Sequence, residues 1–209
     1  MVAQIINTMS HCRFETYLYA AGHDRDRALN LYLWNATIGG AFHLPIQAVE
    51  VALRNRINFA LVSEFGANWW ENERFLTKID HERTRDLNTV FARLKRKDAD
   101  LDTNQIVASL SFGFWVGMLQ ARYNPPIWGA HFRAAFPQVP ATETRNTLFR
   151  IAGRIAQFRN RISHHEPLLK ENISLLYGDI MQLLNWLCPD TAAWIRPVCE
   201  VPKIMRTKP

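Results

Sequence analysis

The chain has little of what disulfide-stabilised, zinc-binding or membrane-spanning proteins need. Its 209 residues include three cysteines, Cys12, Cys188 and Cys199, which are odd in number and far apart. They form neither a disulfide framework nor a zinc-ligand pair, which fits a reducing cytoplasm. No apolar run approaches the roughly 20 residues that cross a bilayer, and the N-terminal segment lacks the features of a signal peptide. We therefore expect a cytoplasmic protein without membrane contact.

Strand signals are also scarce. The sequence has no Asn-Gly or Asp-Gly hairpin turn and few alternating β-branched runs. Hydrophobic residues make up 48% of the chain, with seven Trp and twelve Phe, which is enough for a folded core. The formal net charge of +6 is compatible with nucleic-acid binding without requiring it. Because no linker or composition break interrupts the chain, we predict one all-α domain over residues 1–209.

Apolar periodicity predicts helices along nearly the whole chain. They cover residues 10–21, a segment from Asp24, 45–65, a charged stretch with a solvated face at 80–97, a buried helix beginning within 109–119, about 142–166, and 168–187. The Asp24 carboxylate suits an N-cap. Gly39-Gly40 and Pro45 are expected to break or kink the second helix. A short helix from Pro189 and a basic tail at 197–209 complete the chain.

One stretch near the end of the 142–166 helix suggests chemistry: Phe158-Arg159-Asn160-Arg161-Ile162-Ser163-His164-His165-Glu166-Pro167. Upstream of it, apolar residues recur three and four apart from Leu148 to Ile162, which predicts a buried stripe. Thr142 can cap this helix, and Pro167 disfavours helical geometry at the residue before it. The helix is therefore expected to end near Glu166.

Arg159 falls on the edge of the buried stripe when each residue advances by about 100°. An arginine facing a core needs a partner for its charge, so we predict a largely buried Arg159 paired with an acidic or polar group. Glu50 in the central helix is the favoured partner, although it also lies four residues before Arg54. No metal is expected, because adjacent helical residues such as His164 and His165 diverge.

The same stretch fits the Arg-x(4–6)-His signature of the HEPN superfamily, as Arg159, Asn160, three residues and His164. More closely, the chain resembles the Abi-like family of bacterial phage abortive-infection proteins. Three upstream stretches carry this likeness: Leu31-Tyr32-Leu33-Trp34-Asn35, Val49-Glu50-Val51-Ala52-Leu53-Arg54-Asn55-Arg56-Ile57, and Ser111-Phe112-Gly113-Phe114-Trp115. With the motif they follow the order of the family.

The resemblance implies a HEPN-like helical bundle with additional helices and a metal-independent endoribonuclease that needs no cofactor. It also implies a role in phage defence, or as the toxin of a toxin–antitoxin pair whose antitoxin is a small RNA or a protein. The site would consist of Arg159, Asn160 and His164 acting on an RNA substrate. The supporting residues would be His165, which also fits the looser spacing, Glu50 and Arg54. Arg154 and Arg161 face another side of the helix and are assigned to RNA backbone contact.

Arg159 and His164 lie about 140° apart on one helix, so they do not converge easily on one atom. A homodimer in which two such helices face each other across a two-fold axis removes this difficulty. Two other functions stay open. One is RNA binding without cleavage by the same basic cleft, and the other is a helical module that docks another protein.

Overall fold

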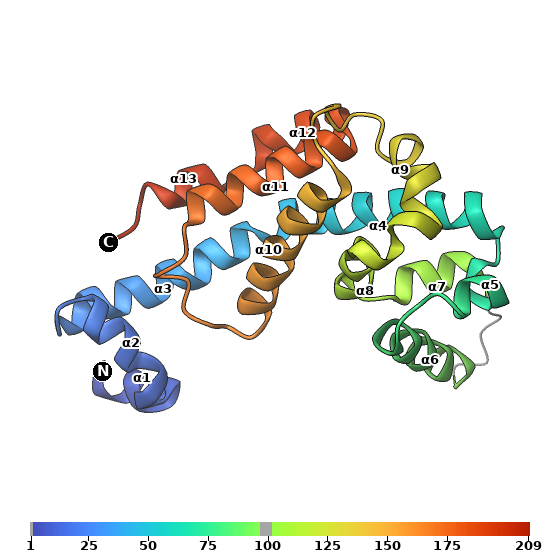
Figure 1. Ribbon diagram of the computed structural model, residues 1–209. Helices are drawn as coiled ribbons and strands as arrows, with labels where there is room; N and C mark the ends of the chain where they lie inside the picture. The colour runs from blue at the N-terminus through green and yellow to red at the C-terminus, as the bar shows by residue number, and fades with distance from the viewer. Residues whose placement is uncertain (1, 97–101) are drawn as a thin grey trace.

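Two helices that follow each other almost end to end form the spine of the protein, α3 (Arg25–Ala41) and α4 (His43–Phe65) (Figure 1). The computed structural model describes residues 2–96 and 102–209. Asp24 caps α3 as predicted, because its carboxylate accepts a hydrogen bond from the backbone N–H of Arg27 at 3.0 Å. Gly66, at a positive φ of 91° that favours glycine, ends α4.

The predicted break in this spine lies at Phe42 and not at the glycine pair. α3 continues through Gly39-Gly40, and Phe42 itself keeps a helical backbone. The Phe42 N–H donates to Ile38 at 3.2 Å, and its carbonyl accepts from Ile46 at 3.1 Å. Pro45 has no N–H, so one backbone hydrogen bond is missing near the start of α4. The result is a short interruption in an otherwise continuous rod.

α4 is the central helix, as its apolar sequence predicts. Its side chains without exposed surface are Val49, Leu53, Ile57, Ala60 and Leu61. From the C-terminal part of the chain, α11 (Ile173–Leu187) and α12 (Pro189–Ile195) pack against it, and α10 (Arg145–Ser163) packs on α11. α11 lies along the spine and packs against α4, α10 and α12 (Figure 1). The described residues contain no strand and form a single compact all-α domain, which confirms the predicted fold class.

The spine also has the length and composition of a membrane span. Within Arg25–Phe65 an 18-residue window reaches a mean hydropathy of 1.2, and 39% of that window is buried inside the protein. Among the described residues this is the one helix that is long and apolar enough to cross a membrane. Core helices of soluble proteins can have the same length and composition. It is weak evidence for a membrane location, because packing inside the bundle accounts for the apolar sequence of α4.

A group of shorter helices surrounds the C-terminal half of α4: α5 (Glu73–Leu76), α6 (His81–Lys95), α7 (Thr103–Ser109), α8 (Phe112–Gly117) and α9 (Gly129–Ala135). The buried helix expected to begin within 109–119 is α8, which starts at Phe112. Leu110 is extended, and Ser111 caps α8 by accepting a hydrogen bond from the backbone of Phe114 at 3.1 Å. The charged helix predicted at 80–97 is α6, and Lys97 lies outside the described residues.

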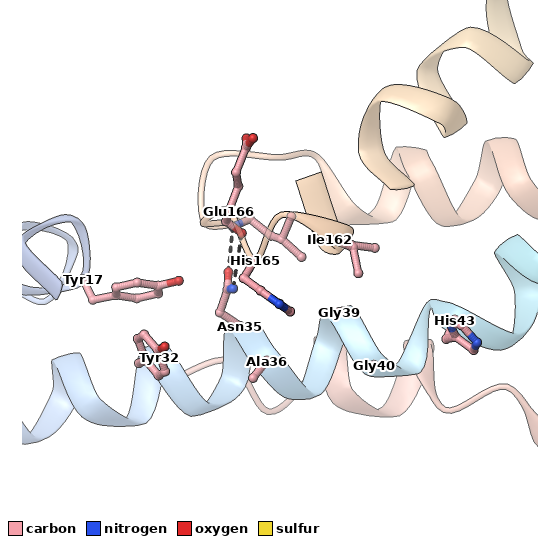
Figure 2. Close-up of a pocket in the computed structure, with 11 residues that line it drawn as sticks. Tyr17, Tyr32, Asn35, Ala36, Gly39, Gly40, His43, Ile162, His165 and Glu166 are labelled. Carbon is pink, nitrogen blue, oxygen red and sulfur yellow. Dashed lines mark hydrogen bonds between the residues drawn. The ribbon is translucent and has the colours of Figure 1, made fainter. Parts of the chain in front are cut away.

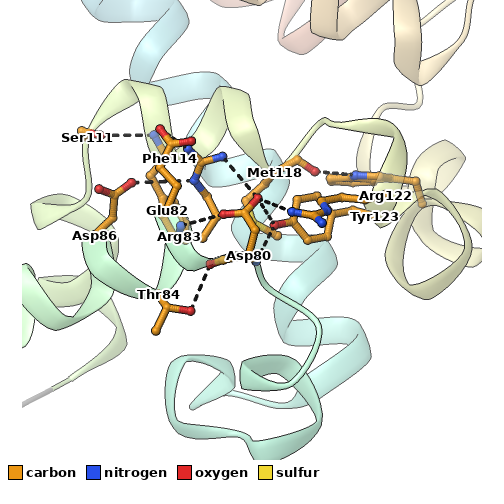
Figure 3. A network of polar contacts seen from close by, with 11 residues as sticks. Asp80, Glu82, Arg83, Thr84, Asp86, Ser111, Phe114, Met118, Arg122 and Tyr123 are labelled. Atoms are coloured by element: carbon orange, nitrogen blue, oxygen red, sulfur yellow. Dashed lines mark hydrogen bonds and ion pairs between the residues drawn. The ribbon is translucent and has the colours of Figure 1, made fainter.

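One face of α6 is less solvated than its charge predicts, because Arg83 is buried. Its side chain is 3% exposed and pairs with Glu82 at 2.7 Å, with Asp86 and Asp80 at 3.7 and 4.0 Å (Figure 3). The guanidinium lies against Gly117 of α8 so closely that a Cβ there would collide with it. The ion pairs of Arg83 thus stay within α6 and its N-cap, and the contact of its guanidinium with Gly117 joins α6 to α8.

Both ends of the chain pack against α3. α1 (Val2–Met9) and α2 (His11–Ala20) form a second apolar cluster with it, which includes Phe14 and Tyr17. The basic tail predicted at 197–209 is partly helical, because α13 (Val201–Met205) packs on α3. Trp34 of α3 donates its indole N–H to the carbonyl of Ile204 at 3.0 Å. This contact needs the folded spine, so the local sequence does not predict it.

Candidate functional site

α10 carries the Arg-x(4)-His motif and is shorter than the predicted 142–166. It begins after Thr144 instead of Thr142, and no side-chain cap bond is present at that residue. The stripe is confirmed, since Leu148, Ile151, Ile155 and Phe158 are buried. The helix ends at Ser163, three residues before the predicted stop, so Pro167 does not set its end.

The motif helix stops in a tight backbone turn that separates the two histidines. The N–H of His165 donates to the carbonyl of Ile162 at 3.0 Å, and the N–H of Glu166 donates to Arg161 at 2.9 Å. These two bonds form a Schellman motif, in which the residue at the position of His165 is most often glycine. His165 accordingly has a φ of 54°, in the left-handed region. His164 and His165 therefore leave the helix in different directions.

Arg159 pairs with Glu50 as predicted, but it is not buried. The Arg159 Nε donates to Glu50 Oε1 at 3.0 Å, and the two side chains are 43% and 26% exposed. The Cα of Arg159 lies at the edge of the apolar stripe, and the long side chain extends beyond it to the surface. The pair borders an open cavity of about 250 Å³ that His43 and Ser163 also line. The Arg159 guanidinium is therefore accessible to an anion.

Arg54 does not form the ion pair with Glu50 that the helical spacing allows. Its Nε is buried, and within residues 2–96 and 102–209 that atom has no hydrogen-bond partner. The carboxylate of Glu50 turns instead to Arg159 on α10.

The two arginines assigned to RNA contact are both held by carboxylates. Arg154 donates to Asp179 of α11 through two bonds of 2.7 and 3.0 Å, and these bonds raise the pKa of Arg154. Arg161 reaches Glu166 at 3.1 Å and Glu171 at 3.2 Å. Their side chains are 43% and 44% exposed. Arg154 fastens α10 to α11, and Arg161 fastens the loop that follows the histidines.

Asn160 and His164 lie on the solvent side of α10. Both residues are exposed, and within the described residues neither side chain has a hydrogen-bond partner. The predicted trio is therefore divided. Arg159 faces the α3–α4 side of the helix, whereas Asn160 and His164 face outward.

Another histidine lies near Arg159, on the side of α10 that faces α3 and α4. His43, the first residue of α4, lines both the cavity beside Arg159 and a larger cavity of about 580 Å³ that His165 also lines (Figure 2). The sequence analysis missed His43. The available signal is its position three and four residues after Gly40 and Gly39, which places all three on one helical face.

These groups are suited to phosphate chemistry. A half-exposed arginine can bind phosphate oxygens, and imidazoles can move protons near neutral pH. Among the described residues, no group of three or more His, Cys, Asp or Glu side chains is arranged to hold a metal ion.

The motif residues Arg159 to His165, with His43, Glu50 and Arg54, lie within one region that matches a family model. No curated protein and no solved structure matches the chain. The model of the family described as Abi-like protein matches residues 6–170, which run from α1 through the loop after the histidines. That range covers most of the 209 residues. The chain therefore belongs to the Abi-like protein family.

Proposed function

We propose that this protein is a metal-independent endoribonuclease of the HEPN type, which acts in the cytoplasm during bacterial abortive infection or as the toxin of a toxin–antitoxin pair. The observation that carries the proposal is the accessible Arg159, set by Glu50 within a helix-end motif that ends in two imidazoles. Membership of the Abi-like family supports the abortive-infection role.

The chemistry assigned to these residues is cleavage by the neighbouring 2′-hydroxyl of RNA. The 2′-oxygen attacks phosphorus and gives its proton to a base, while the 5′-oxygen leaves and takes a proton from an acid. His164 serves these proton transfers, and Arg159 stabilises the charge on the phosphorane oxygens. Asn160 orients the imidazole or the substrate. The products are a 2′,3′-cyclic phosphate and a 5′-hydroxyl.

The division of the trio favours a homodimer. One helix presents Arg159 and His164 on different sides, so a second copy is needed to supply the missing groups to one cleft. The outward face of α10 has a feature that suits such contact. Gly153 lies in the middle of this face, and a Cβ there would meet nothing within 4 Å. A mid-helix glycine without a neighbour weakens the helix, which is reasonable where another helix approaches closely.

The test is incubation of purified protein with end-labelled single-stranded RNA in excess EDTA. We expect cutting to persist, to leave 2′,3′-cyclic or 3′-phosphate ends, and to fail at a 2′-deoxyribose. Dependence on metal with 5′-phosphate products would contradict the proposal. RNA that is bound but never cut would indicate the non-catalytic alternative. If the protein neither binds nor cuts RNA, the remaining alternative is the helical module that docks another protein.

A further inference from the structure

The larger cavity beside the site lies between three parts of the chain that are distant in sequence. α2 contributes Tyr17, α3 contributes the floor, and the loop after α10 contributes His165 (Figure 2). Its volume of about 580 Å³ is within the range of roughly 300–1,000 Å³ typical of small-molecule sites. Its walls are mostly apolar, so it suits a flat, weakly polar group better than a bare phosphate.

Tyr17 gives this cavity a polar group that the protein itself does not use. The residue is 1% exposed, and its hydroxyl points into the cavity (Figure 2). Within the described residues that hydroxyl has no hydrogen-bond partner, whereas the neighbouring Tyr32 donates to Met9 at 3.5 Å. Burial raises the pKa of Tyr17 to about 12, so the phenol is neutral at pH 7 and can both donate and accept. The hydroxyl oxygen is reached from the cavity, so it is available for a hydrogen bond with a group bound there.

The side opposite Tyr17 is held rigidly. The Asn35 amide donates to the carbonyl of Glu166 at 3.5 Å and accepts from the N–H of Leu168 at 2.6 Å (Figure 2). This clamp fixes the loop that carries His165. The left-handed backbone of His165 is unfavourable for a residue with a Cβ, so glycine would be the stabler choice for the turn. The imidazole at the cavity wall is therefore retained at a cost in stability.

Small residues open the floor of the cavity. Ala36, Gly39 and Gly40 follow one another on the face of α3, and a Cβ on Gly40 would meet nothing within 4 Å. The cavity adjoins the one beside Arg159, because His43 and Ile162 line both. A group bound over the glycines would thus lie next to a phosphate held at Arg159.

We infer that this cavity binds one unpaired base of the RNA substrate, next to the phosphate that is cut. The inference rests on the proposed endoribonuclease function and adds a base-recognition pocket to it. The base lies on the flat floor of α3, and its edge exchanges a hydrogen bond with the Tyr17 hydroxyl. The imidazoles of His43 and His165 border the opening and contact the base or its ribose. Unpaired bases are recognised by stacking on aromatic side chains, histidine included, together with hydrogen bonds to their edges, and the imidazoles of His43 and His165 are the stacking groups here.

Two variants test the pocket without removing a proposed catalytic group. Gly40→Leu fills the open floor with a side chain whose Cβ would meet nothing within 4 Å, and Tyr17→Phe removes only the hydroxyl. Gly178→Leu on α11 is the matched control, since its Cβ would also meet nothing within 4 Å and it lines neither cavity. The readout is the rate of cutting at each position in a pool of random single-stranded RNA, together with an RNA abasic at the preferred position.

We expect the natural protein and Gly178→Leu to cut beside a preferred base and to cut the abasic RNA at least about tenfold more slowly, as for a lost stacked base. Tyr17→Phe should reduce the preference by about three- to tenfold, the range of one hydrogen bond. Gly40→Leu should abolish the preference. If Gly40→Leu keeps the base preference, or if the natural protein cuts abasic RNA as fast as intact RNA, the pocket alone is overturned. Absence of any RNA cutting by the natural protein overturns the proposed function and the pocket together.

Discussion

At the residue scale, the two adjacent histidines occupy different environments although they are neighbours in the chain. His164 is the last residue that the helical ladder reaches, and its exposed imidazole faces outward with Asn160. His165 has a left-handed backbone and lines the larger cavity. Under the proposed function, His164 would therefore be the group for proton transfer in a site shared between two copies, and His165 would belong to substrate selection.

This difference predicts that a substitution of His164 changes the cutting rate, whereas a substitution of His165 changes the stability. His164→Ala should lower the cutting rate by about 10²–10⁴-fold, the contribution of one general acid–base group, with little change in stability. His165→Gly should raise the free energy of unfolding by about 1 kcal/mol, because glycine adopts the left-handed turn without strain. Urea denaturation and single-turnover kinetics measure both effects. A fully active His164→Ala would show that proton transfer depends on another group.

The exposed ion pair of Arg159 predicts a variant that is inactive yet stable. Because its side chain is 43% exposed, Arg159→Ala should change the free energy of unfolding by less than about 1 kcal/mol. The cutting rate should fall by about 10²-fold or more through loss of charge stabilisation. Glu50→Gln, which keeps the shape, is the companion variant and should reduce the rate less. If Arg159→Ala unfolds the protein, the arginine is structural.

At the scale of the elements, the junction between α6 and α8 depends on a glycine. The Arg83 guanidinium is buried against Gly117, whereas a Cβ on Gly113 of the same helix would meet only Ser111 Oγ at an ordinary 3.6 Å. Charged side chains thereby fill an interface that apolar packing fills elsewhere in the bundle. A buried charge of this kind needs its partners in place.

Two glycine-to-alanine changes in α8 should therefore have opposite signs. Gly117→Ala should lower the free energy of unfolding by about 1–3 kcal/mol, the cost of overpacking a filled interface. Gly113→Ala should be neutral or stabilising by up to about 1 kcal/mol, because alanine is the better helix former. Thermal and urea unfolding compare the two. Equal effects would mean that Arg83 moves aside without cost.

The carboxylate at the start of α6 predicts a pH dependence of stability. Burial alone would raise the pKa of Asp80, but hydrogen bonds from the Arg83 backbone, Arg122 and Tyr123 outweigh it and lower that pKa below 3.8. Since the pKa is lower in the folded chain than in the unfolded chain, Asp80 stabilises the fold fully above about pH 4 and progressively less as the pH falls.

Asp80→Asn should accordingly be less stable than the natural protein at pH 7, and the difference should shrink below about pH 4. The pKa of Asp86 is shifted in the opposite direction, since burial raises it. Asp86→Asn is therefore the control and should not show this loss. Urea denaturation at a series of pH values measures both. A difference that is independent of pH would contradict the assignment.

At the scale of the whole molecule, the outward face of α10 is the surface where the proposed function needs a second copy. Its exposed residues are polar and surround a glycine with open space: Asn146, Arg150, Gln157, Asn160 and His164 around Gly153. The inner face of the same helix is anchored to α4 through Arg159 and to α11 through Arg154. The helix is thus rigid on one side and available on the other.

Gly153→Leu should convert a dimer into a folded monomer and abolish cutting, because the side chain blocks the approach of the second α10. Within one copy the change is tolerated, since a Cβ there meets nothing within 4 Å. Gly178→Leu on α11 serves again as the control and should stay dimeric. Sedimentation at micromolar concentration with a cutting assay measures the outcome. A monomeric natural protein that cuts RNA would contradict the shared site.

The sequence by itself determined the helical class, the central position of α4, the Asp24 cap of α3 and the apolar stripe of α10. These features depend on residues within a few turns of one another, through apolar periodicity and local hydrogen bonds such as that of Asp24. The pairing of Arg159 with Glu50 was also predicted from the position of the arginine on the stripe, although the burial predicted with it was wrong.

Only the tertiary structure decided which groups of the motif are brought together. The exposure of Arg159, the pairing of Arg154 with Asp179, and the cavity between Tyr17 and His165 join segments that are distant in the chain. The direction of His165 likewise depends on a loop that Asn35 of α3 holds in place. Such contacts arise where separate helices meet, and helical periodicity specifies the face of each helix but not the partner that covers it.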